Sequence, residues 1–441
     1  MSALALLARR RGVAVSGCDP DPSGAADVAA LGATVLAGHD PAHLQGARAV
    51  VVTAAVPANQ PELAAARAAG IAVIPRKQAL ADLVNPGTVV ALAGTHGKST
   101  TTVMTTEALT AAGLAPTGLA GGRVSAWGGN AKVGGDQLFV VEADEYDQAF
   151  LTLQPTVAVV NNVEADHLEC YGSVEALEAA FAEFAGRART VLIGADDPGA
   201  ARVAQALQAR AGGPIVWRFG FAADAELHIG PVAQEAGGSV AELRLPGGER
   251  VTLRLAVPGI HNVRNAAGAL GAVLALGGNL GKALEALAGY GGLGRRFERL
   301  GDAGGMTFVD DYAHHPSELV ATLAAARQAF PGRRLVAVFQ PHLFSRTQAH
   351  AGAMGQALAA ADIAIVTGIY PAREQPIPGV TAELVVRAAA EAGTAVLFEP
   401  DKTRLGERIR SVARPGDVVL TMGAGDITRV GRDLVQWLRA A

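Results

Sequence analysis

The chain has 441 residues, with 37 basic and 41 acidic side chains, which gives a net charge of −4 at neutral pH. A chain of this length predicts about three domains. A slightly acidic balance without basic runs argues against a dedicated nucleic-acid or membrane-surface binder. Two cysteines cannot form a disulfide framework, so we expect a cytoplasmic protein. The uncharged stretch Asn265–Gly281 is too short and too rich in glycine for a membrane span.

Short apolar runs rich in β-branched residues alternate along the chain with longer helical patterns rich in alanine and leucine. Continuous apolar runs that alternate with helices are typical of parallel strands buried on both faces. We therefore predict an α/β fold with doubly wound sheets. The predicted strands, in chain order, are Ala49–Val56, Thr88–Ala93, Leu138–Val141, Thr156–Val160, Val191–Gly194, Leu335–Phe339, Ile363–Thr367 and Asp417–Met422.

Two breaks interrupt this alternation. Asn85-Pro86-Gly87 predicts a turn, and a glycine cluster at Gly289–Gly294 ends a helical pattern. Between them, Ala241–Ala256 alternates apolar and polar residues around Pro246-Gly247-Gly248, which predicts an antiparallel hairpin at the edge of the middle domain. The predicted domains are residues 1–86, 87–293 and 294–441.

The strongest local pattern is the run TVVALAGTHGKSTTT at residues 88–102. An apolar strand leads into a glycine turn, a lysine, a hydroxyl residue and a helix. Glycines let backbone N–H groups approach phosphate oxygens, the lysine balances phosphate charge, and the Ser99 hydroxyl can ligate Mg²⁺. Only two residues separate Gly94 from Gly97, where the general phosphate loop has four. An ordinary helix N-terminus capped by Ser99 is therefore the alternative interpretation.

This loop, with its short glycine spacing, resembles the ATP loop GT[HN]GK[ST]T of the Mur ligase superfamily, which also includes the folylpolyglutamate synthases. The resemblance implies that ATP binds at Gly94, Thr95, His96, Gly97, Lys98, Ser99 and Thr100.

Polar residues follow the next two predicted strands. Glu142 ends the run LFVVE, and His167 lies beyond the strand Thr156–Val160. An acidic residue beside a phosphate loop can hold Mg²⁺, and the carboxyl ends of parallel strands meet at one edge of a sheet. Taken singly, Glu142 could be a solvated strand end and His167 an ordinary loop histidine. In Mur ligases a glutamate and a histidine at these points share Mg²⁺ with the loop hydroxyl. The resemblance assigns the metal to Ser99, Glu142 and His167, and catalytic roles to Lys98, Glu142 and His167.

The segment PGIHNVRN at residues 258–265 precedes a helical pattern. Its asparagine amides could read an adenine edge, or Asn262 could cap the helix. The resemblance implies that His261, Asn262 and Asn265 contact the nucleotide base.

The last predicted domain contains three further motifs: RRFE at residues 295–298, FVDDYAHHPSE at 308–318 and LVAVFQPHLFSRT at 335–347. Taken without a family resemblance, these motifs could be a solvated hinge and two surface loops that have no role in binding. The family resemblance instead implies that Arg296 reaches phosphate and that Asp311, Tyr312 and His314 meet the nucleotide. It also implies that His342 and Arg346 are catalytic residues that meet the sugar-linked carboxyl group and the incoming amino acid. Many relatives have Arg where this chain has Leu343.

The resemblance covers essentially the whole chain, with five motifs in the family order. The motifs are most similar to those of the branch that attaches L-alanine to UDP-N-acetylmuramate, and the absence of lysine between Lys132 and Lys282 fits a branch without a carbamylated lysine. This implies an ATP- and Mg²⁺-dependent ligase whose lactyl carboxylate substrate passes through an acyl phosphate. The first domain would be a Rossmann-like UDP-sugar-binding domain, the second a central P-loop ATPase-type sheet, and the third a Rossmann-like amino-acid domain.

One departure concerns the beginning of the chain. The family opens with a strand and a glycine loop that cradles the UDP pyrophosphate, whereas this sequence begins at the tail of that loop. We therefore expect a first domain without its first strand, with an exposed sheet edge and poor UDP-sugar binding. Three alternatives to the main hypothesis stay open. They are another Mur-type enzyme (a recycling ligase that adds a preformed peptide, or a folylpolyglutamate synthase), a P-loop kinase without ligase activity, and a non-catalytic relative.

Overall fold

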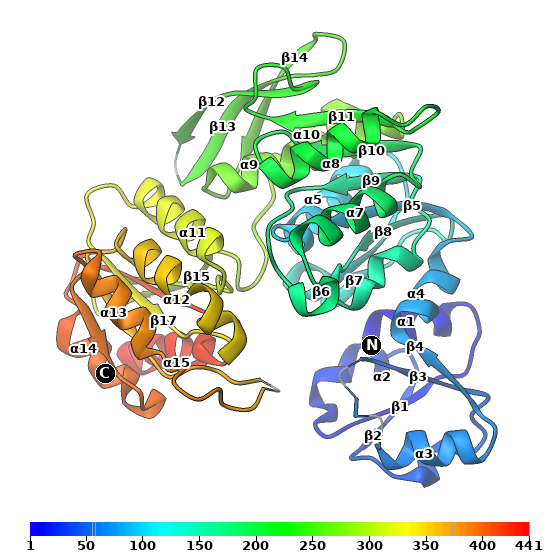
Figure 1. The fold of residues 1–441 in the computed structure, drawn as a ribbon, viewed down its shortest axis with the longest axis horizontal. Coiled ribbons are helices and arrows are strands. Elements are labelled where there is room, and N and C mark those ends of the chain that lie inside the picture. The colour runs from blue at the N-terminus through cyan, green and yellow to red at the C-terminus, as the bar shows by residue number, and fades with distance from the viewer. Residues whose placement is uncertain (55, 58, 236, 373, 441) are drawn as a thin grey trace. The chain divides into compact units, whose positions relative to one another are not determined.

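The computed structural model describes residues 1–54, 56–57, 59–235, 237–372 and 374–440, so the predicted strand Ala49–Val56 includes one position, 55, outside the described residues. The chain forms two compact units. Unit 1 contains residues 1–231, 242–253 and 264–287, and unit 2 contains residues 232–241, 254–263 and 288–441. The α/β class is confirmed, because both units are built on largely parallel sheets alternating with helices (Figure 1).

The N-terminal region of unit 1 carries two separate two-stranded parallel sheets, β1–β2 and β3–β4. Their residues are exposed or half-buried, and each strand has a neighbour on one edge only, which leaves backbone N–H and C=O groups unpaired on the other edge. Leu4 and Leu7 of the first helix are buried. The elements are α1 (Ser2–Arg10), β1 (Ser16–Asp19), η1 (Pro22–Ala25), α2 (Ala26–Ala29), β2 (Thr34–Ala37), η2 (Pro41–Leu44), β3 (Ala49–Val52), α3 (Pro61–Ala68), β4 (Ala72–Pro75) and α4 (Arg76–Val84).

The middle of the chain forms a ten-stranded sheet in the order β14-β13-β12-β11-β10-β9-β5-β8-β6-β7. Its strands are β5 (Thr88–Ala93), β6 (Thr117–Val124), β7 (Gly129–Lys132), β8 (Leu138–Glu142), β9 (Val157–Val160), β10 (Thr190–Gly194), β11 (Ile215–Gly220), β12 (Leu227–Glu235), β13 (Gly238–Arg244) and β14 (Arg250–Leu255). The helical segments are α5 (Lys98–Ala111), η3 (Ser125–Trp127), η4 (Tyr146–Thr152), α6 (Leu168–Tyr171), α7 (Val174–Ala185), α8 (Pro198–Gln208), α9 (Ile260–Ala275) and α10 (Leu280–Ala288).

Strand β5 lies at the centre of this sheet, parallel to β8 on one side and to β9 on the other. Its residues 89–93 are fully buried, as the apolar run predicted. The three strands therefore end at the same edge, which is where parallel sheets bind ligands. The predicted hairpin is confirmed at the far edge of the sheet, where β13 and β14 are neighbours and Gly247 and Gly248 form the turn with φ of +98° and +93°.

Unit 2 contains a six-stranded sheet in the order β15-β16-β20-β17-β18-β19, in which only the β15–β16 pair is antiparallel. Leu335, Ala337 and Phe339 of β17 pack into one core cluster, and the alternating Val336 and Val338 into another. Both faces are covered, which explains the uninterrupted apolar run. The elements are β15 (Glu298–Ala303), β16 (Met306–Asp311), α11 (Pro316–Ala329), β17 (Leu335–Phe339), α12 (Phe344–Leu358), β18 (Ile363–Val366), α13 (Glu383–Glu391), β19 (Val396–Phe398), η5 (Lys402–Arg404), α14 (Leu405–Val412), β20 (Val418–Met422) and α15 (Ile427–Ala440).

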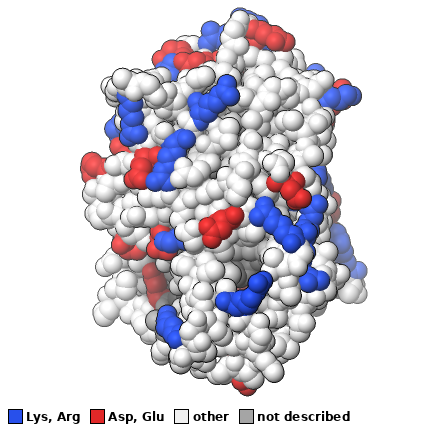
Figure 2. Space-filling view, turned by 90° about the vertical axis from the view of Figure 1, so that its right-hand side faces the viewer, with Lys and Arg blue, Asp and Glu red and all other residues white. Residues whose placement is uncertain are grey.

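The face of the molecule drawn in Figure 2 carries charges of both signs. On the face drawn in Figure 2, Lys and Arg side chains are interspersed with Asp and Glu rather than gathered into one basic field. Within the described ranges, no helix combines the length and apolar character needed to cross a bilayer.

Candidate active site

The loop between β5 and α5 depends on two glycines. Gly94 and Gly97 have φ of +130° and +80°, which L side chains rarely adopt. A Cβ on Gly97 would lie 2.6 Å from Oδ1 of Asn265, and a Cβ on Gly94 would lie 3.0 Å from the backbone nitrogen of Asn161. The loop therefore packs closely against β9 and α9, which leaves room only for bare backbone at these two positions.

Helix α5 begins with a run of threonines that would ordinarily disfavour a helix. The Thr101 and Thr102 hydroxyls donate to the carbonyls of Gly97 and Lys98, each at 2.9 Å, which satisfies these buried hydroxyls inside the helix. Thr100 is also buried. The N-cap is Gly97, and the Ser99 side chain makes no capping bond. The alternative interpretation of Ser99 as a helix cap is therefore wrong.

Lys98 lies among acceptors. Its Nζ donates to Glu145 Oε1 at 2.8 Å and to the Gly94 carbonyl at 2.7 Å. Burial alone would lower the Lys98 pKa, but the carboxylates of Glu145, Asp144 and Glu142 outweigh burial and raise it. Burial also raises the pKa of Glu145, although Lys98 opposes that effect. The lysine is therefore held as a cation directly beneath the glycine loop.

The Ser99 hydroxyl and the Glu142 carboxylate meet at the end of β8. Ser99 Oγ donates to Glu142 Oε1 at 3.1 Å, and the Gly121 backbone N–H donates to Oε2 at 2.7 Å. A Cβ on Gly121 would lie 2.8 Å from Oε2, so β6 approaches the carboxylate as closely as it can. A hydroxyl and a carboxylate form an all-oxygen donor pair, which fits the preference of Mg²⁺.

His167 is placed differently from the other two predicted metal ligands. It has φ of +53° and caps the short helix α6. Its ring nitrogens lie 3.3 Å from Glu169 Oε1 and 3.8 Å from Asp166 Oδ2, and the ring packs edge-on against Tyr146. The structure thus brings Ser99 and Glu142 together and engages His167 with carboxylates of its own loop.

Two asparagines after β9 hold the glycine loop in place. Asn162 Oδ1 accepts a 2.7 Å hydrogen bond from the His96 N–H, and Asn161 Nδ2 donates to the His96 carbonyl at 3.2 Å. The Thr95 hydroxyl accepts from the Glu164 N–H at 2.8 Å. These asparagines, together with Gly121 and Glu145, are site residues that the sequence analysis did not select. The two asparagines follow the end of β9 directly, which is the signal that could have found them, whereas Gly121 lies inside β6 and Glu145 lies three residues beyond β8.

The PGIHNVRN segment forms the start of α9, with helix beginning at Ile260. Asn262 is therefore inside the helix rather than a cap, and its Nδ2 donates to the Pro258 carbonyl at 2.7 Å. A Cβ on Gly259, which has φ of +101°, would lie 2.5 Å from the His261 ring. Of the predicted base-contacting residues, the structure brings Asn265 next to the glycine loop.

In unit 2, the RRFE and DDYAHHPSE motifs fold against each other. The guanidinium groups of Arg295 and Arg296 lie 4.8 Å and 5.0 Å from the centre of the Tyr312 ring. Arg296 also pairs with Glu318, and a Glu318 oxygen lies 3.0 Å from His314 Nδ1. Four predicted site residues therefore lie together near the end of β16, whose last residue is Asp311. They are Arg296, Asp311, Tyr312 and His314.

The Asp311 carboxylate is buried and accepts hydrogen bonds from the backbone N–H groups of Phe297 at 2.7 Å and Ala313 at 2.8 Å. Burial raises its pKa to about 6, against the opposing effect of Arg296. A raised carboxyl pKa means that the folded state holds the proton more tightly than the unfolded state. The contribution of Asp311 to stability is therefore fully present below the unfolded pKa and is lost as the pH rises through the folded pKa.

We expect this effect to distinguish wild type from Asp311→Asn. Between about pH 4 and pH 6, wild type should lose up to about 3 kcal/mol of unfolding free energy relative to the variant. Urea unfolding of both proteins across this range measures the difference in slope, which does not depend on any constant offset between them. The exposed Asp433→Asn serves as the matched control. Parallel pH profiles for wild type and Asp311→Asn would contradict the assignment.

The QPHLFSRT loop places its histidine and arginine side by side. His342 Nδ1 lies 3.5 Å from Arg346 Nη1, and the His342 ring stacks on Tyr370 at 5.8 Å. Burial lowers the His342 pKa to about 4, reinforced by His314 and Arg346. The imidazole is therefore neutral at physiological pH, and the buried Arg346 carries the positive charge. Leu343, the N-cap of α12, has φ of +68°, an unusual conformation for leucine.

Three parts of the chain match the Mur ligase family. Residues 1–87 match the Mur ligase family catalytic domain, residues 92–273 the Mur ligase middle domain, and residues 295–425 the Mur ligase glutamate ligase domain. The chain belongs to the Mur ligase family.

Individual relatives show which members of the family are similar to this chain. The chain is 46% identical to a UDP-N-acetylmuramate–L-alanine ligase of Kineococcus radiotolerans, over 99% of this chain and 94% of the relative. The crystal structure of a UDP-N-acetylmuramate–alanine ligase from Thermotoga maritima superimposes with a TM-score of 0.83 and 26% identity, covering 100% of this chain and 96% of that one. A murein peptide ligase from Psychrobacter arcticus shares the fold, with a TM-score of 0.71 and 24% identity over 99% of this chain and 96% of that one.

Proposed function

We propose that this protein is an ATP-dependent ligase that joins L-alanine to the lactyl carboxylate of UDP-N-acetylmuramate through an acyl phosphate. The observation that carries the proposal is the grouping of Lys98, Ser99 and Glu142 at the glycine loop, in a chain 46% identical to a relative of that name. We assign the reaction to the cytoplasm, where ATP is available. In this proposal residues 1–86 bind the UDP-sugar, residues 87–293 bind ATP and residues 294–441 bind the amino acid.

In unit 1 the phosphates of ATP would lie over the glycine loop. Backbone N–H groups at a helix N-terminus favour anions, and Lys98 adds a full positive charge that stabilises the transferring phosphoryl group. Ser99 and Glu142 would hold Mg²⁺, which neutralises phosphate charge when it is bound, and His167 is the proposed third ligand. The residues proposed to contact ATP in this unit are Gly94, Thr95, His96, Gly97, Lys98, Ser99, Thr100 and Asn265.

In unit 2 the residues proposed to act fall into two groups. Arg346 provides a buried cation for a substrate carboxylate, and the neutral His342 imidazole can donate or accept one hydrogen bond beside it. Two carboxylate-bearing substrates repel each other, so a fixed cation lowers the cost of bringing them together. The residues proposed to contact the nucleotide are His261, Asn262, Arg296, Asp311, Tyr312 and His314.

The reaction requires no nucleophilic side chain. A lactyl carboxylate oxygen attacks the γ-phosphorus and ADP leaves. The amine of L-alanine then attacks the acyl carbon, the carbon–oxygen bond breaks, and inorganic phosphate departs with the original carboxylate oxygen and the proton lost by the nitrogen. The protein's contribution is positioning and charge stabilisation.

Product analysis tests the proposal against its alternatives. Protein, ATP, Mg²⁺ and UDP-N-acetylmuramate should release ADP in multiple turnovers only when L-alanine is also present, with one amide product per ADP. ADP release that is independent of any amino acid would favour a P-loop kinase. Turnover with a preformed peptide but not with L-alanine would favour the recycling type of ligase. Binding of ATP without any turnover would favour the non-catalytic relative.

Two adjacent glycines offer a matched test of the Glu142 site. Because a Cβ on Gly121 would lie 2.8 Å from the Glu142 carboxylate, we expect Gly121→Ala to displace that carboxylate and to raise the Mg²⁺ concentration for half-maximal turnover about 10- to 100-fold. A Cβ on Gly122 has nothing within 4 Å, so Gly122→Ala should behave like wild type. A Mg²⁺ titration of turnover in the three proteins measures the effect. Identical Mg²⁺ dependence in all three would remove Glu142 from the metal site.

A further inference from the structure

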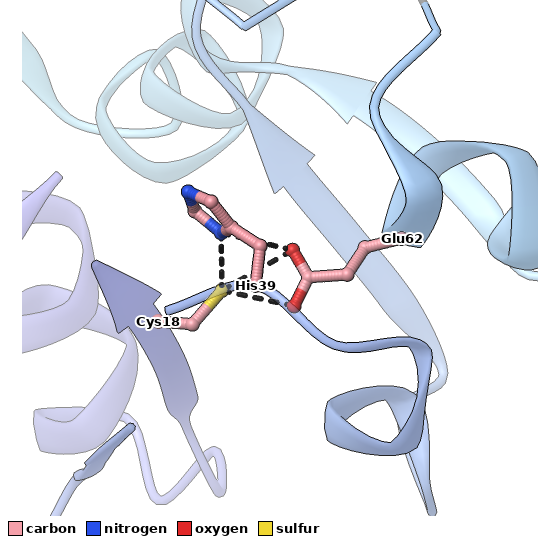
Figure 3. Close-up of side chains that lie close together, drawn as sticks. All are labelled: Cys18, His39 and Glu62. Carbon is pink, nitrogen blue, oxygen red and sulfur yellow. Dashed lines mark hydrogen bonds and ion pairs between the residues drawn. The ribbon is translucent and has the colours of Figure 1, made fainter. Parts of the chain in front are cut away.

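A cluster of potential metal ligands lies in the N-terminal region, among residues given no role so far. Cys18 is on β1, His39 follows β2, and Glu62 is in the first turn of α3 (Figure 3). Cys18 Sγ lies 3.4 Å from His39 Nδ1 and 3.3 Å from Glu62 Oε2, and His39 Nδ1 lies 3.2 Å from that same carboxylate oxygen. One thiol, one imidazole and one carboxylate thus face a common point.

The carboxylate at the centre of this cluster is almost fully buried, with 9% of its side chain exposed. Its ion-pair partners among the described residues are His39 and His43, and no lysine or arginine of the described chain pairs with it. A buried carboxylate is costly unless it is hydrogen-bonded or binds a metal. Hydrogen-bond donors stabilise the charged form of Glu62, so its side chain is available as an anionic ligand for a cation.

The second oxygen of Glu62 is oriented by separate contacts. Oε1 accepts a 3.2 Å hydrogen bond from the Asp40 N–H and lies 3.0 Å from His43 Nδ1, while Gln60 Nε2 donates to Oε2 at 2.8 Å. Metal-binding carboxylates are typically held in this way by partners that do not themselves bind the ion. The side chain is therefore preorganised rather than free to turn away.

The spacing of the three ligand atoms fits a tetrahedral transition metal. Zinc binds sulfur at about 2.3 Å and nitrogen or oxygen at about 2.0–2.2 Å, which places neighbouring ligand atoms about 3.3–3.6 Å apart. The three observed separations of 3.4, 3.3 and 3.2 Å lie close to that range. A sulfur and a nitrogen ligand select zinc and similar ions over Mg²⁺, which prefers oxygen.

We propose that Cys18, His39 and Glu62 form a binding site for Zn²⁺ or a similar thiophilic divalent ion, with the fourth position open to solvent. His39 is exposed, with 38% of its side chain accessible, which gives the ion a path of entry. The ion would join β1, the turn after β2, and α3, which belong to the part of the chain built from small, exposed two-stranded sheets. The three side chains lie within residues 1–86, the part of the chain proposed to bind the UDP-sugar, but the proposed ligase reaction uses none of them.

Metal titration of the full-length, tag-free protein tests the site. After chelator treatment and dialysis, wild type should bind one Zn²⁺ in excess Mg²⁺, and Co²⁺ in its place should give the near-ultraviolet absorption of a thiolate–cobalt bond. Cys18→Ser should bind Zn²⁺ at least about 100-fold more weakly and lose that absorption. The other cysteine supplies the matched control, since Cys170→Ser should retain both properties.

A second variant distinguishes the loss of a metal ligand from the loss of the fold. His39→Ala replaces an exposed side chain, so it should preserve the circular dichroism spectrum while weakening Zn²⁺ binding about 10- to 100-fold. The proposal is overturned if wild type binds no stoichiometric Zn²⁺. It is equally overturned if a folded Cys18→Ser or His39→Ala binds the ion as tightly as wild type.

Discussion

Replacing Lys98 with alanine should lower the rate of amide formation by at least about 1000-fold, because the transferring phosphoryl group then loses its fixed cation. The same change leaves the buried Glu145 carboxylate without its 2.8 Å partner. Breaking a buried ion pair in this way costs about 3–5 kcal/mol, so Lys98→Ala should also unfold more easily. Turnover and unfolding must therefore be measured together, by coupled ADP release and by urea denaturation.

Two further variants separate these effects. Lys98→Arg keeps a positive charge for Glu145 and should recover much of the stability, yet it should remain poorly active because the guanidinium does not reproduce a compact ammonium group. Lys282→Ala removes an exposed lysine that pairs with Glu285 and should match wild type in both measurements. Substantial turnover by a folded Lys98→Ala would refute the role assigned to this lysine.

Replacing Arg346 with alanine should raise the KM for L-alanine about 100-fold, because a buried charged contact to a substrate carboxylate is lost. The neighbouring His342 cannot take over that charge, because burial is the main cause of its lowered pKa and remains in the variant. Steady-state kinetics with varied L-alanine at saturating ATP and sugar nucleotide measure the effect.

The control for this change is Arg299→Ala. That guanidinium is 59% exposed and pairs with Asp302 on the surface, so its loss should leave the KM unchanged. An unaltered KM for L-alanine in Arg346→Ala would show that the amino acid's carboxylate is bound elsewhere.

The strands of the two larger sheets could be predicted from the sequence because both of their faces are buried. In β17, consecutive residues pack into opposite core clusters, so every position is apolar and the run is unmistakable. The four short strands β1–β4 differ, since they keep exposed residues and form separate pairs. Which strands pair and how deeply they are buried depends on their neighbours, which local sequence does not encode.

The candidate site was predictable in part for a similar reason. Ser99 lies just beyond β5 and Glu142 ends the adjacent parallel strand β8, so both lie at the same edge of the sheet, 3.1 Å apart. Three acidic residues follow β8, and the sequence could not show that Glu145 is the one that reaches Lys98. That choice depends on the loop backbone, where Asp147 and Gln148 both have φ of +52°. The orientation of His167 toward Asp166 and Glu169 depends in the same way on its own φ of +53°.

The most direct test of the central claim, activation of a carboxylate by ATP for amide formation, follows one oxygen atom. UDP-N-acetylmuramate with ¹⁸O in both lactyl carboxylate oxygens is converted with ATP and L-alanine, and the released phosphate is analysed by mass spectrometry. Because the carbon–oxygen bond of the acyl phosphate breaks when the amine attacks, each phosphate should contain one ¹⁸O atom. Unlabelled phosphate, formed together with the amide product, would contradict the acyl phosphate route.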